Sequence, residues 1–415
     1  MKAPPTASVI VVSRGRPAAL CRCLMSLSQQ DYPNFEIVVI ADAAGRFALA
    51  EQGFGRIVKQ SGFDEANISA ARNMGIALAA GELVAFIDDD SAAEPTWLSR
   101  LLAPFADDRV AATTGYVLGR NGISLQWAAS WVDALGRSHA LDVDEAEYSL
   151  HEATPGAAVK TEGTNMAFRR MLLAQMGGFD PAFRFYLDET DLNMRQALAG
   201  QITAVVPLAQ VHHGFAEGPY RRADRVPRSL FEIGASTAVF LRKHASGGAH
   251  AAQVASLIAE QRRRLLRHMV SGAIDPHDVR RLMATLQGGL TDGFARRLAY
   301  LPEIGAPEAA FAPVPRTGPR PGRLVSGWWW QQRGLAARAR DMVAQGAIAT
   351  ELRLSPTTAY HHVRYHPGGY WEQTGGVFGR SLRGGALMQF TSPAARRRAE
   401  IARIAATRPV DTLLG

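Results

Sequence analysis

Cysteine is nearly absent from this 415-residue sequence, which contains only Cys21 and Cys23. Because the two lie two residues apart on a predicted helix, their side chains point to different faces and a structural disulfide is not expected. No apolar run reaches the ~18 residues of a membrane-spanning helix. The short apolar stretch near the N-terminus favours a strand over a signal peptide. We therefore expect a globular, cytoplasmic protein.

Several motifs with a defined chemistry are also missing. The sequence has no Gly-x-Gly-x-x-Gly or Walker-type phosphate loop, no arrangement that supports a Ser-His-Asp triad, and no internal repeat. It has no recognisable nucleic-acid-binding motif either. The chemistry of this chain is therefore expected at other residues.

Charge is distributed unevenly along the chain. Residues 1–220 contain 17 Lys and Arg against 25 Asp and Glu, whereas residues 221–415 contain 29 against 13. A basic half predicts contact with an anionic partner such as a membrane surface, a polyanionic glycan or nucleic acid, and a solvated basic surface is the alternative. Through this half, the protein would make peripheral contact with the inner face of the membrane.

The chain is long enough for two or three domains. We predict an α/β domain over residues 1–225, a helical extension over 226–301, a Pro-rich linker over 302–323, and a basic, aromatic C-terminal region over 324–415. Within the extension, an apolar stripe beside several arginines at 258–270 favours a helix that packs on its own domain. A helix that lies on a membrane surface is the alternative.

The N-terminal part alternates between strand and helix patterns. A nearly unbroken apolar run, Ala7 to Ser13, is followed by leucines at helical spacing after Pro17. A second strand pattern ends at Asp42, and the apolar run Leu83 to Ile87 ends directly before three aspartates. This β-α-β order predicts an α/β fold with a doubly wound, mostly parallel sheet, which binds ligands at the carboxyl ends of its strands.

The three aspartates, Asp88, Asp89 and Asp90, deliver a dense negative charge to one strand end. Carboxylates this close repel one another unless a cation or protonation relieves them. A divalent ion with oxygen ligands is the usual relief where a phosphate is the third partner. The pattern therefore favours a bound nucleotide diphosphate, and a solvated acidic turn is the alternative.

A second acidic cluster, Asp188, Glu189 and Asp191, lies at the predicted start of a helix. The helix dipole favours negative charge there, so capping explains one or two of these acids. Capping explains three acids in four residues less well, which indicates a chemical role for the cluster.

Taken in order, these features resemble family 2 glycosyltransferases of the GT-A fold, which transfer a sugar from a nucleotide donor to an acceptor with inversion at the anomeric carbon. The likeness spans residues 7 to 215. It is carried by Ser8-Val9-Ile10-Val11-Val12 before Arg16-Pro17, Gln30-Asp31-Tyr32-Pro33-Asn34, Ala70-Ala71-Arg72-Asn73-Met74-Gly75, Gly163-Thr164-Asn165, Gly177-Gly178-Phe179-Asp180 and the segment from Asp188 to Arg195. The resemblance implies a GT-A catalytic domain, with a Rossmann-like, mostly parallel sheet, over residues 1–225.

The resemblance also implies roles for individual residues. By this likeness, Asp42 receives the nucleobase, Asp89 the ribose, and Asp90 a divalent metal, Mn²⁺ or Mg²⁺, that bridges the two donor phosphates. Arg72 either adds positive charge at the phosphates or ties its helix to a strand. His213 matches a family position whose histidine contacts the metal or the diphosphate.

Inverting transfer needs a general base that takes the proton of the attacking hydroxyl. Glu189 aligns best with the base of the family, although an Asp is more usual there, so Asp188 and Asp191 are the alternatives. A neighbouring carboxylate raises the pKa of one member of such a pair, which suits a base.

The donor site departs from the family pattern in two places. Ser13-Arg14-Gly15-Arg16 stands where the family commonly has an aromatic residue and an Asn, and Ala41-Asp42-Ala43 keeps one acid of a frequent pair. The nucleobase and the donor sugar therefore stay open.

From the sequence we expect an inverting, metal-dependent glycosyltransferase of the hexosyltransferase type. It would use a nucleotide-sugar donor and a saccharide or lipid-linked saccharide acceptor in the synthesis of a cell-surface or exported polysaccharide, and the acceptor rests on family likeness alone. Two alternatives stay open: a non-catalytic scaffold that binds a nucleotide sugar, and a nucleic-acid-binding protein that uses the basic C-terminal half. No nucleic-acid partner is expected, since no motif supports one.

Overall fold

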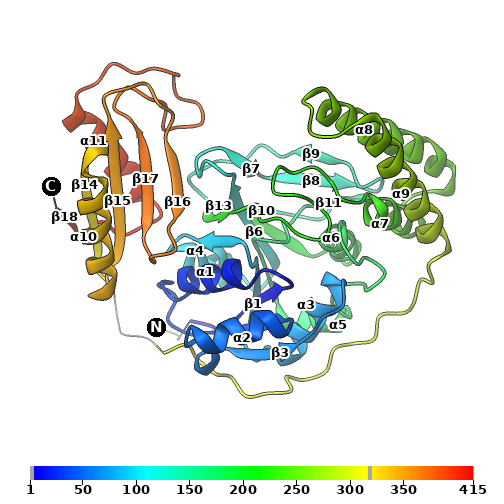
Figure 1. Ribbon diagram of the computed structural model, residues 1–415. Coiled ribbons are helices and arrows are strands. Elements are labelled where there is room, and N and C mark those ends of the chain that lie inside the picture. The colour runs from blue at the N-terminus through cyan, green and yellow to red at the C-terminus, as the bar shows by residue number, and fades with distance from the viewer. Residues whose placement is uncertain (1–3, 316–319, 415) are drawn as a thin grey trace.

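The computed structural model describes residues 4–315 and 320–414. A large sheet with helices on both faces forms its centre (Figure 1). Along its main path the strand order is β10-β13-β6-β12-β4-β1-β2-β3, with β5 beside β13 and β7 beside β6. The strands are β1 (Ala7–Ser13), β2 (Phe35–Ala41), β3 (Lys59–Gly62), β4 (Leu83–Asp88), β5 (Ser91–Ala93), β6 (Val110–Leu118), β7 (Leu125–Trp127), β10 (Ser149–His151), β12 (Met166–Arg169) and β13 (Ile202–His213).

Parallel pairing prevails along the main path of the sheet. Strands β3, β2, β1 and β4 are parallel to one another, and β6 is parallel to β13. Strand β12 lies antiparallel between β4 and β6. The predicted α/β fold with a mostly parallel sheet is confirmed by this topology.

The apolar runs of the N-terminal strands arise because helices cover both faces of the sheet. In β1, Val9 and Val11 join the core on the side of α1 and α4, whereas Ile10 joins the core on the side of α3, α5 and α6. These helices are α1 (Pro17–Leu27), α3 (Ile68–Leu78), α4 (Trp97–Leu102), α5 (Arg170–Gln175) and α6 (Asp188–Leu198), and α2 (Ala43–Glu51) follows β2. Each strand end is thereby fixed between two packed layers.

The register of the strands brings the acidic strand ends to one edge. Val12 of β1 is paired with Ile40 of β2 on one side and with Asp88 of β4 on the other. Asp42, which follows β2, and the aspartates at the end of β4 therefore lie at the same carboxyl edge. The β1–α1 loop runs between them.

A small second sheet and three long helices extend this core. The small sheet consists of β11 (Ala157–Val159), β8 (Ser130–Asp133) and β9 (Ser138–Ala140), and Val132 packs with Phe183 and Phe240. The helices are α7 (Phe231–His244), α8 (His250–Val270) and α9 (Pro276–Ala295).

Most of the apolar stripe of α8 packs within the protein. Leu265 is buried in one cluster with Leu282 and Leu286 of α9, and Ile258 and Met269 pack against it. Leu266 and Val270 are exposed. This agrees with the predicted helix that packs on its own domain. Among the helices of the described residues, none combines the length and the apolar character that a membrane crossing requires.

The Pro-rich segment that follows α9 runs along the surface of the main sheet and its helices (Figure 1). Three of its backbone N–H groups, of Ile304, Glu308 and Val314, donate to backbone carbonyls of the N-terminal part at 2.9–3.0 Å. The side chain of Val314 is buried in the main core. The segment predicted as a linker therefore acts as a strap bonded along the domain.

The strap leads to a third sheet near the C-terminus. Its strand order is β16-β17-β15-β14-β18, with β16 the antiparallel edge strand. The elements are β14 (Gly322–Trp328), α10 (Gln332–Ala344), β15 (Ile348–Ser355), β16 (His362–Tyr365), β17 (Trp371–Gly376), α11 (Pro393–Ile404) and β18 (Thr412–Leu414). This part of the chain thus has its own α/β arrangement.

A buried ionic network joins the C-terminal sheet to the main sheet. Glu94, which follows β5, receives two hydrogen bonds from Arg408 at 2.6 and 2.9 Å and lies 2.8 Å from His212 Nε2. The Arg408 guanidinium and the His212 ring both lie against Trp371, at 4.2 and 4.7 Å. Burial raises the pKa of Glu94, but Arg408 and His212 outweigh burial and lower the pKa to about 2. The carboxylate is therefore charged at neutral pH.

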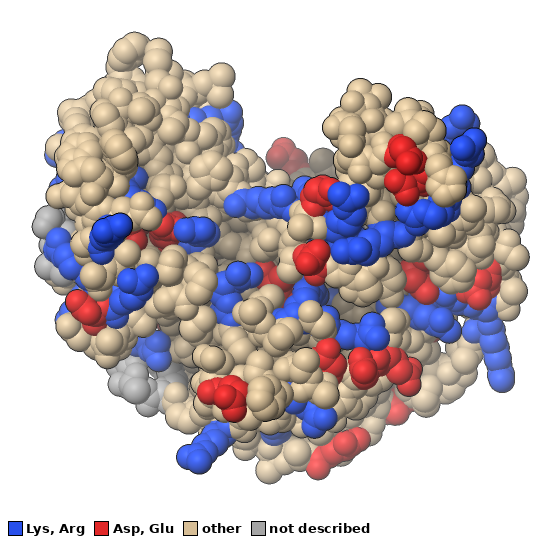
Figure 2. All heavy atoms as spheres, in the orientation of Figure 1, with Lys and Arg blue, Asp and Glu red and all other residues tan. Residues whose placement is uncertain are grey.

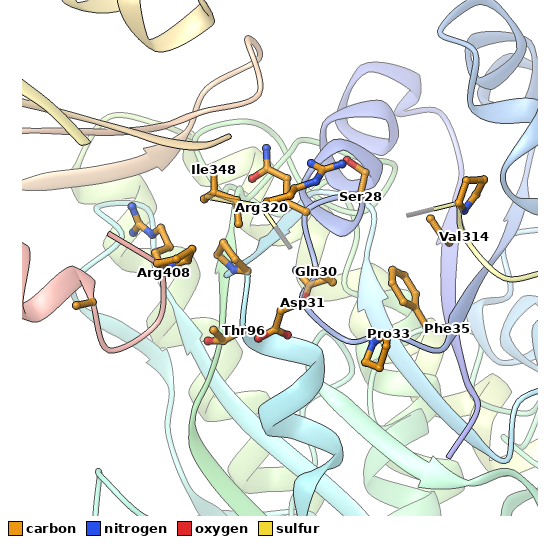
Figure 3. Close-up of a pocket in the computed structure, with 15 residues that line it drawn as sticks. Ser28, Gln30, Asp31, Pro33, Phe35, Thr96, Val314, Arg320, Ile348 and Arg408 are labelled. Carbon is orange, nitrogen blue, oxygen red and sulfur yellow. The ribbon is translucent and has the colours of Figure 1, made fainter. Parts of the chain in front are cut away.

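A cavity of about 750 Å³ lies beside this junction. Figure 3 shows Ile348 and Arg408 of the C-terminal part on one side of it, Gln30 and Thr96 of the main domain on another, and Val314 of the strap at its margin. The residues that line it do not include the acids at the carboxyl edge of the main sheet.

Replacing Arg408 is expected to weaken the junction. In Arg408→Met, the buried charge of Glu94 keeps only His212 as an ionic partner, which typically costs about 3 kcal/mol or more. We expect unfolding at a lower urea concentration and faster proteolysis of the C-terminal part. Arg398→Met, on the exposed side of α11, is the matched control. Equal urea midpoints for the two variants would show that the network does not hold the sheets together.

Candidate active site

Asp88, Asp90 and His213 form a compact group at the carboxyl edge of the main sheet, which we call the Asp-Asp-His group. Asp88 ends β4, and His213 ends β13, where it is paired with Ser91 of β5. One ligand atom of each side chain lies within 4.8 Å of the other two. The Asp88 side chain is 32% exposed, whereas those of Asp90 and His213 are buried.

The His213 ring is held by a hydrogen bond on its far side. Its Nδ1 lies 2.8 Å from Oε1 of Gln126, and since an amide oxygen only accepts, Nδ1 carries the proton. Its Nε2 is directed toward Asp90 Oδ1, 3.2 Å away. The rings of Trp127 and Phe215 flank the imidazole. A polar partner behind a metal-binding histidine is the usual way to orient it.

Asp90 is held from two sides. Its Oδ2 accepts the backbone N–H of Ala216 at 2.8 Å and lies 3.2 Å from Arg16. Burial raises the pKa of Asp90, but His213 and Arg16 outweigh burial and hold that pKa below its usual range. Asp90 is therefore ionised.

The Asp-Asp-His group fits a divalent cation. Oδ1 of Asp90 is buried and has no hydrogen-bond donor among the described residues. It lies 3.2 Å from His213 Nε2, and a divalent ion bound by the two atoms would take the place of a proton on Nε2. Two carboxylate oxygens with one imidazole nitrogen suit Mn²⁺ better than Mg²⁺, which prefers oxygen ligands alone.

Asp89 points away from this group. Its side chain is fully buried and lies 2.6 Å from Arg16 Nη2. Burial raises the pKa of Asp89 to about 7, although Arg16 acts in the opposite direction. A fully buried carboxylate does not fit the expected contact with a ribose, and the exposed Asp88 is the better placed acid.

Arg16 is a site residue that the sequence did not reveal as such. It bridges Asp89 and Asp90 and so neutralises part of the repulsion at the end of β4. In the sequence, Arg16 is visible as the residue before Pro17 and as part of a departure from the family pattern, without a role of its own. Its reach to β4 depends on the packing of the β1–α1 loop.

Asp42 fastens two backbone segments at the same edge. Its Oδ1 accepts the N–H of Gly45 at 2.8 Å and caps α2, and its Oδ2 accepts the N–H of Gly15 at 2.7 Å. Gly15 has a φ of +70°, a left-handed conformation that favours glycine. Each carboxylate oxygen keeps further lone-pair capacity for a ligand.

Arg72 links the two acidic clusters. The guanidinium is buried, pairs with Asp188, donates to the carbonyl of Gly163 at 3.0 Å and lies 3.7 Å from Asp88. It also lies over the ring of Phe179. Both suggested roles are compatible with this position, since Arg72 ties α3 to α6 and also adds charge beside Asp88.

Asp188 and Glu189 begin α6 after a strained turn. Tyr186 and Leu187 have φ values of 73° and 64°, which are uncommon for residues with side chains. Burial raises the pKa of Asp188 to about 8, with a further rise from Glu189, and Arg72 opposes the rise. Glu189 is half-buried and accepts a hydrogen bond from Thr190 at 3.2 Å. Of the two acids, Glu189 is the more accessible.

Glu162 and Lys160 are neighbours of this pair that the sequence did not single out. They form an ion pair at 3.2 Å beside Glu189. Burial raises the pKa of Glu162 to about 7, because it outweighs the lowering effect of Lys160, and Glu189 adds to the rise.

Asp191 belongs to a different network. It is fully buried, with Oδ1 bound to Lys243 at 2.7 Å and His244 at 2.8 Å and Oδ2 bound to Arg195 at 2.9 Å. Burial raises its pKa, but His244, Arg195 and Lys243 outweigh burial and hold it below the usual range. Asp191 therefore ties α6 to α7 and does not fit the role of a base.

Residues 8–174 match the family model described as "Glycosyl transferase family 2". This part of the chain is similar to that family. The match contains Asp42, Arg72, Asp88 and Asp90, whereas Glu189 and His213 lie beyond it.

Curated relatives of this chain include proteins named for glycan synthesis. The O-antigen biosynthesis protein RfbC of Myxococcus xanthus is 30% identical over 239 residues, which cover 54% of this chain and 18% of that protein. The glucosyl-dolichyl phosphate glucuronosyltransferase of Haloferax volcanii is 26% identical over 178 residues, 41% of this chain and 54% of that protein. The chain thus matches about half or less of the length of these relatives.

Among solved structures, the mannosyltransferase PcManGT from Pyrobaculum calidifontis, in complex with GDP-Man and Mn²⁺, is similar. It has 17% sequence identity and a TM-score of 0.41, and the match covers 70% of this chain and 87% of that one.

The shifted pKa of Glu162 predicts a pH-dependent stability. In the folded chain the Glu162 carboxyl keeps its proton up to about pH 7, whereas in the unfolded chain it releases the proton near pH 4.5. The wild type therefore loses stability as the pH rises between these values. The Glu162→Gln variant does not lose stability in this way, because its amide does not ionise. We expect its unfolding free energy to exceed that of the wild type increasingly above pH 4.5, by up to about 3 kcal/mol at pH 8.

Urea denaturation at pH 5 and pH 8 measures this difference. Glu152→Gln, at an exposed position, is the control. A Glu162→Gln effect that is the same at both pH values would contradict the raised pKa.

Proposed function

We propose that this chain is an inverting, metal-dependent glycosyltransferase that moves a sugar from a nucleotide-sugar donor to a saccharide or lipid-linked saccharide. One observation carries the proposal: the Asp-Asp-His group and the Asp188-Glu189 pair lie on the two sides of Arg72. Such a site has a place for a diphosphate and a separate carboxylate for the acceptor. The family of residues 8–174 and the names of the curated relatives support the same class of reaction.

The donor is assigned to the carboxyl edge between β2 and β4. Asp42 and the β1–α1 loop would meet the nucleobase, and Asp88, instead of the buried Asp89, would meet the ribose or the metal. Arg72 lies close enough to Asp88 to add positive charge where the phosphates bind.

Asp88, Asp90 and His213 would hold the metal, with Mn²⁺ preferred over Mg²⁺. When bound, such an ion neutralises the diphosphate that leaves with the electrons of the broken glycosidic bond. Gln126 orients the ring of His213, and Arg16 limits the repulsion between the acids. These residues prepare the group for a cation.

Glu189 is assigned as the general base. In inverting transfer, the acceptor hydroxyl attacks the anomeric carbon from the face opposite the leaving group, and its proton passes to the base. Asp188 forms an ion pair with Arg72. Glu189, in contrast, is partly exposed and has no ion-pair partner within 4.0 Å among the described residues. Lys160 and Glu162 border Glu189 and adjust the local charge.

The wider role is assigned from the names of the relatives. Synthesis of a cell-surface or exported polysaccharide fits the O-antigen relative, and a lipid-linked acceptor fits the dolichyl phosphate relative. A cytoplasmic location and peripheral membrane contact through the basic half stay predictions.

Asp90→Ala is expected to abolish metal-dependent donor binding. The variant removes one metal ligand and leaves His213 without its acidic neighbour. Calorimetric titration with UDP, GDP, dTDP and CMP, each with and without Mn²⁺, should show one nucleotide that binds the wild type with Mn²⁺ and binds the variant at least about tenfold more weakly. His213→Ala should behave alike, and circular dichroism checks the fold. Unchanged metal-dependent binding in both variants would refute the metal assignment.

Glu189→Gln is expected to separate binding from transfer. Because the amide cannot take a proton, the variant should bind the nucleotide with Mn²⁺ like the wild type but lose transfer by roughly a hundredfold or more. The measurement is the turnover of a sugar donor that carries the nucleotide identified by calorimetry. Glu65→Gln, an exposed acid of the same domain, is the control. Full activity of the Glu189→Gln variant would assign the role of base to Asp188. If the wild type binds the nucleotide but shows no turnover, the scaffold alternative is favoured.

A further inference from the structure

Arginines from three separate elements converge beside the Asp-Asp-His group. Arg120 lies in the β6–β7 loop, Arg221 and Arg225 lie in the segment after β13, and Arg264 lies in α8. Figure 2 shows Lys and Arg side chains gathered in a row across the floor of the hollow between the C-terminal sheet and the helices α8 and α9. We call these four residues the arginine cluster.

Phe215 is the centre of the cluster. The guanidinium carbons of Arg225 and Arg120 lie 3.8 and 5.3 Å from the centroid of its ring. The same ring lies 4.5 Å from the imidazole of His213. Arg120 also donates to the carbonyl of Ala223 at 2.7 Å, which fixes the loop and the segment to each other.

The backbone next to Phe215 is bonded to Asp90. The N–H of Gly214 donates to the Asp90 carbonyl at 2.8 Å, and the N–H of Ala216 donates to its carboxylate at 2.8 Å. A Cβ at residue 214 would stand 2.5 Å from that carbonyl oxygen, so only glycine permits this approach. Phe215 itself has a left-handed backbone with φ of 53°. The arginine cluster is therefore fixed at the metal group.

Three of the four arginines lack an acidic partner. Within the described residues, no carboxylate lies within 4.0 Å of Arg120, Arg221 or Arg225, whereas Glu260 is an acidic neighbour of Arg264. The acids of the same segment already have other partners: Asp224 forms an ion pair with Arg222 at 2.7 Å, and Glu217 forms one with Arg228 at 3.5 Å.

The arginines also repel one another. Burial lowers the pKa of Arg225, and Arg120, Arg221 and Arg264 lower it further. Guanidinium groups that are brought together without carboxylates form a typical binding site for an anion with several oxygens.

The cluster lies on the acceptor side of the proposed site. Arg16 approaches Asp90 from the loop that Asp42 holds, which is the nucleotide side. Ala216 approaches Asp90 from the segment that carries Arg221 and Arg225. Arg264 is near Tyr186, three residues before Glu189. An anion on the cluster would therefore lie between the metal group and the base, where the attacking hydroxyl has to enter.

We propose that the acceptor carries a phosphate group, that Arg120 and Arg225 bind it, and that Arg221 and Arg264 add positive charge nearby. The inference rests on the proposed function and names the class of acceptor at that site. Planar guanidinium groups can each give two parallel hydrogen bonds to phosphate oxygens, which matches a cluster of arginines better than one of lysines.

Titration of the full chain with octyl phosphate tests the proposal. The protein is first saturated with Mn²⁺ and the nucleoside diphosphate that it binds, so that the donor position is filled. We expect octyl phosphate to bind the wild type and to bind Arg225→Gln and Arg120→Gln roughly tenfold more weakly, because each variant loses a charged hydrogen-bond donor. Arg222→Gln, in the same segment but paired with Asp224, should bind like the wild type.

Three results would each overturn the proposal. Octyl phosphate could fail to bind or bind all variants equally, octanoate could bind as tightly as octyl phosphate, or the Arg225 and Arg120 variants could lose nucleoside diphosphate affinity to the same extent. The last result would assign the cluster to the donor diphosphate. Octyl phosphate is also titrated in the absence of nucleotide, so that its binding is measured even if the wild type binds no nucleotide. Failure of the wild type to bind any nucleotide counts against the proposed function. Failure to bind octyl phosphate counts against this inference.

Discussion

Repulsion among the carboxylates at the end of β4 is the constraint around which the rest of the site is arranged. Ionised acids in a buried setting need positive or hydrogen-bonding partners. Arg16 supplies one partner to Asp89 and Asp90, Arg72 lies between Asp88 and Asp188, and the backbone N–H of Ala216 caps Asp90. Each partner comes from a different element, so the acids connect the β1–α1 loop, α3 and the segment after β13.

The end of β13 connects the metal group with the C-terminal sheet. Adjacent residues of a strand face opposite sides, so His213 turns toward Asp90 while His212 turns toward Glu94. Glu94 is bound in turn by Arg408, which lies on Trp371. The C-terminal sheet thus helps to hold the end of β13, which carries His213. Trp371 of this sheet lies at the junction.

Backbone strain is concentrated at the same place. Among the described residues, the non-glycine residues with left-handed backbone are Tyr186, Leu187, Phe215 and Arg225. The first two precede the Asp188-Glu189 pair, and the other two belong to the segment beside His213. Such conformations persist only where surrounding contacts hold them, and they are typical of functional sites. They shape the turn before the proposed base and the segment that carries part of the arginine cluster.

The sequence by itself determined the strand and helix order of the N-terminal part and the presence of acids at its strand ends. Both follow from local periodicity, as in the apolar run before Asp88 and the leucines after Pro17. The tertiary structure decided which acids face the ligand. Because strand register and loop packing set side-chain direction, Asp88 is exposed while Asp89 is buried against Arg16. The same long-range packing brought Glu162 beside Glu189, took Asp191 into a separate network and bonded the Pro-rich segment to the domain. No spacing along the chain could show these contacts, since their partners lie far apart in the sequence.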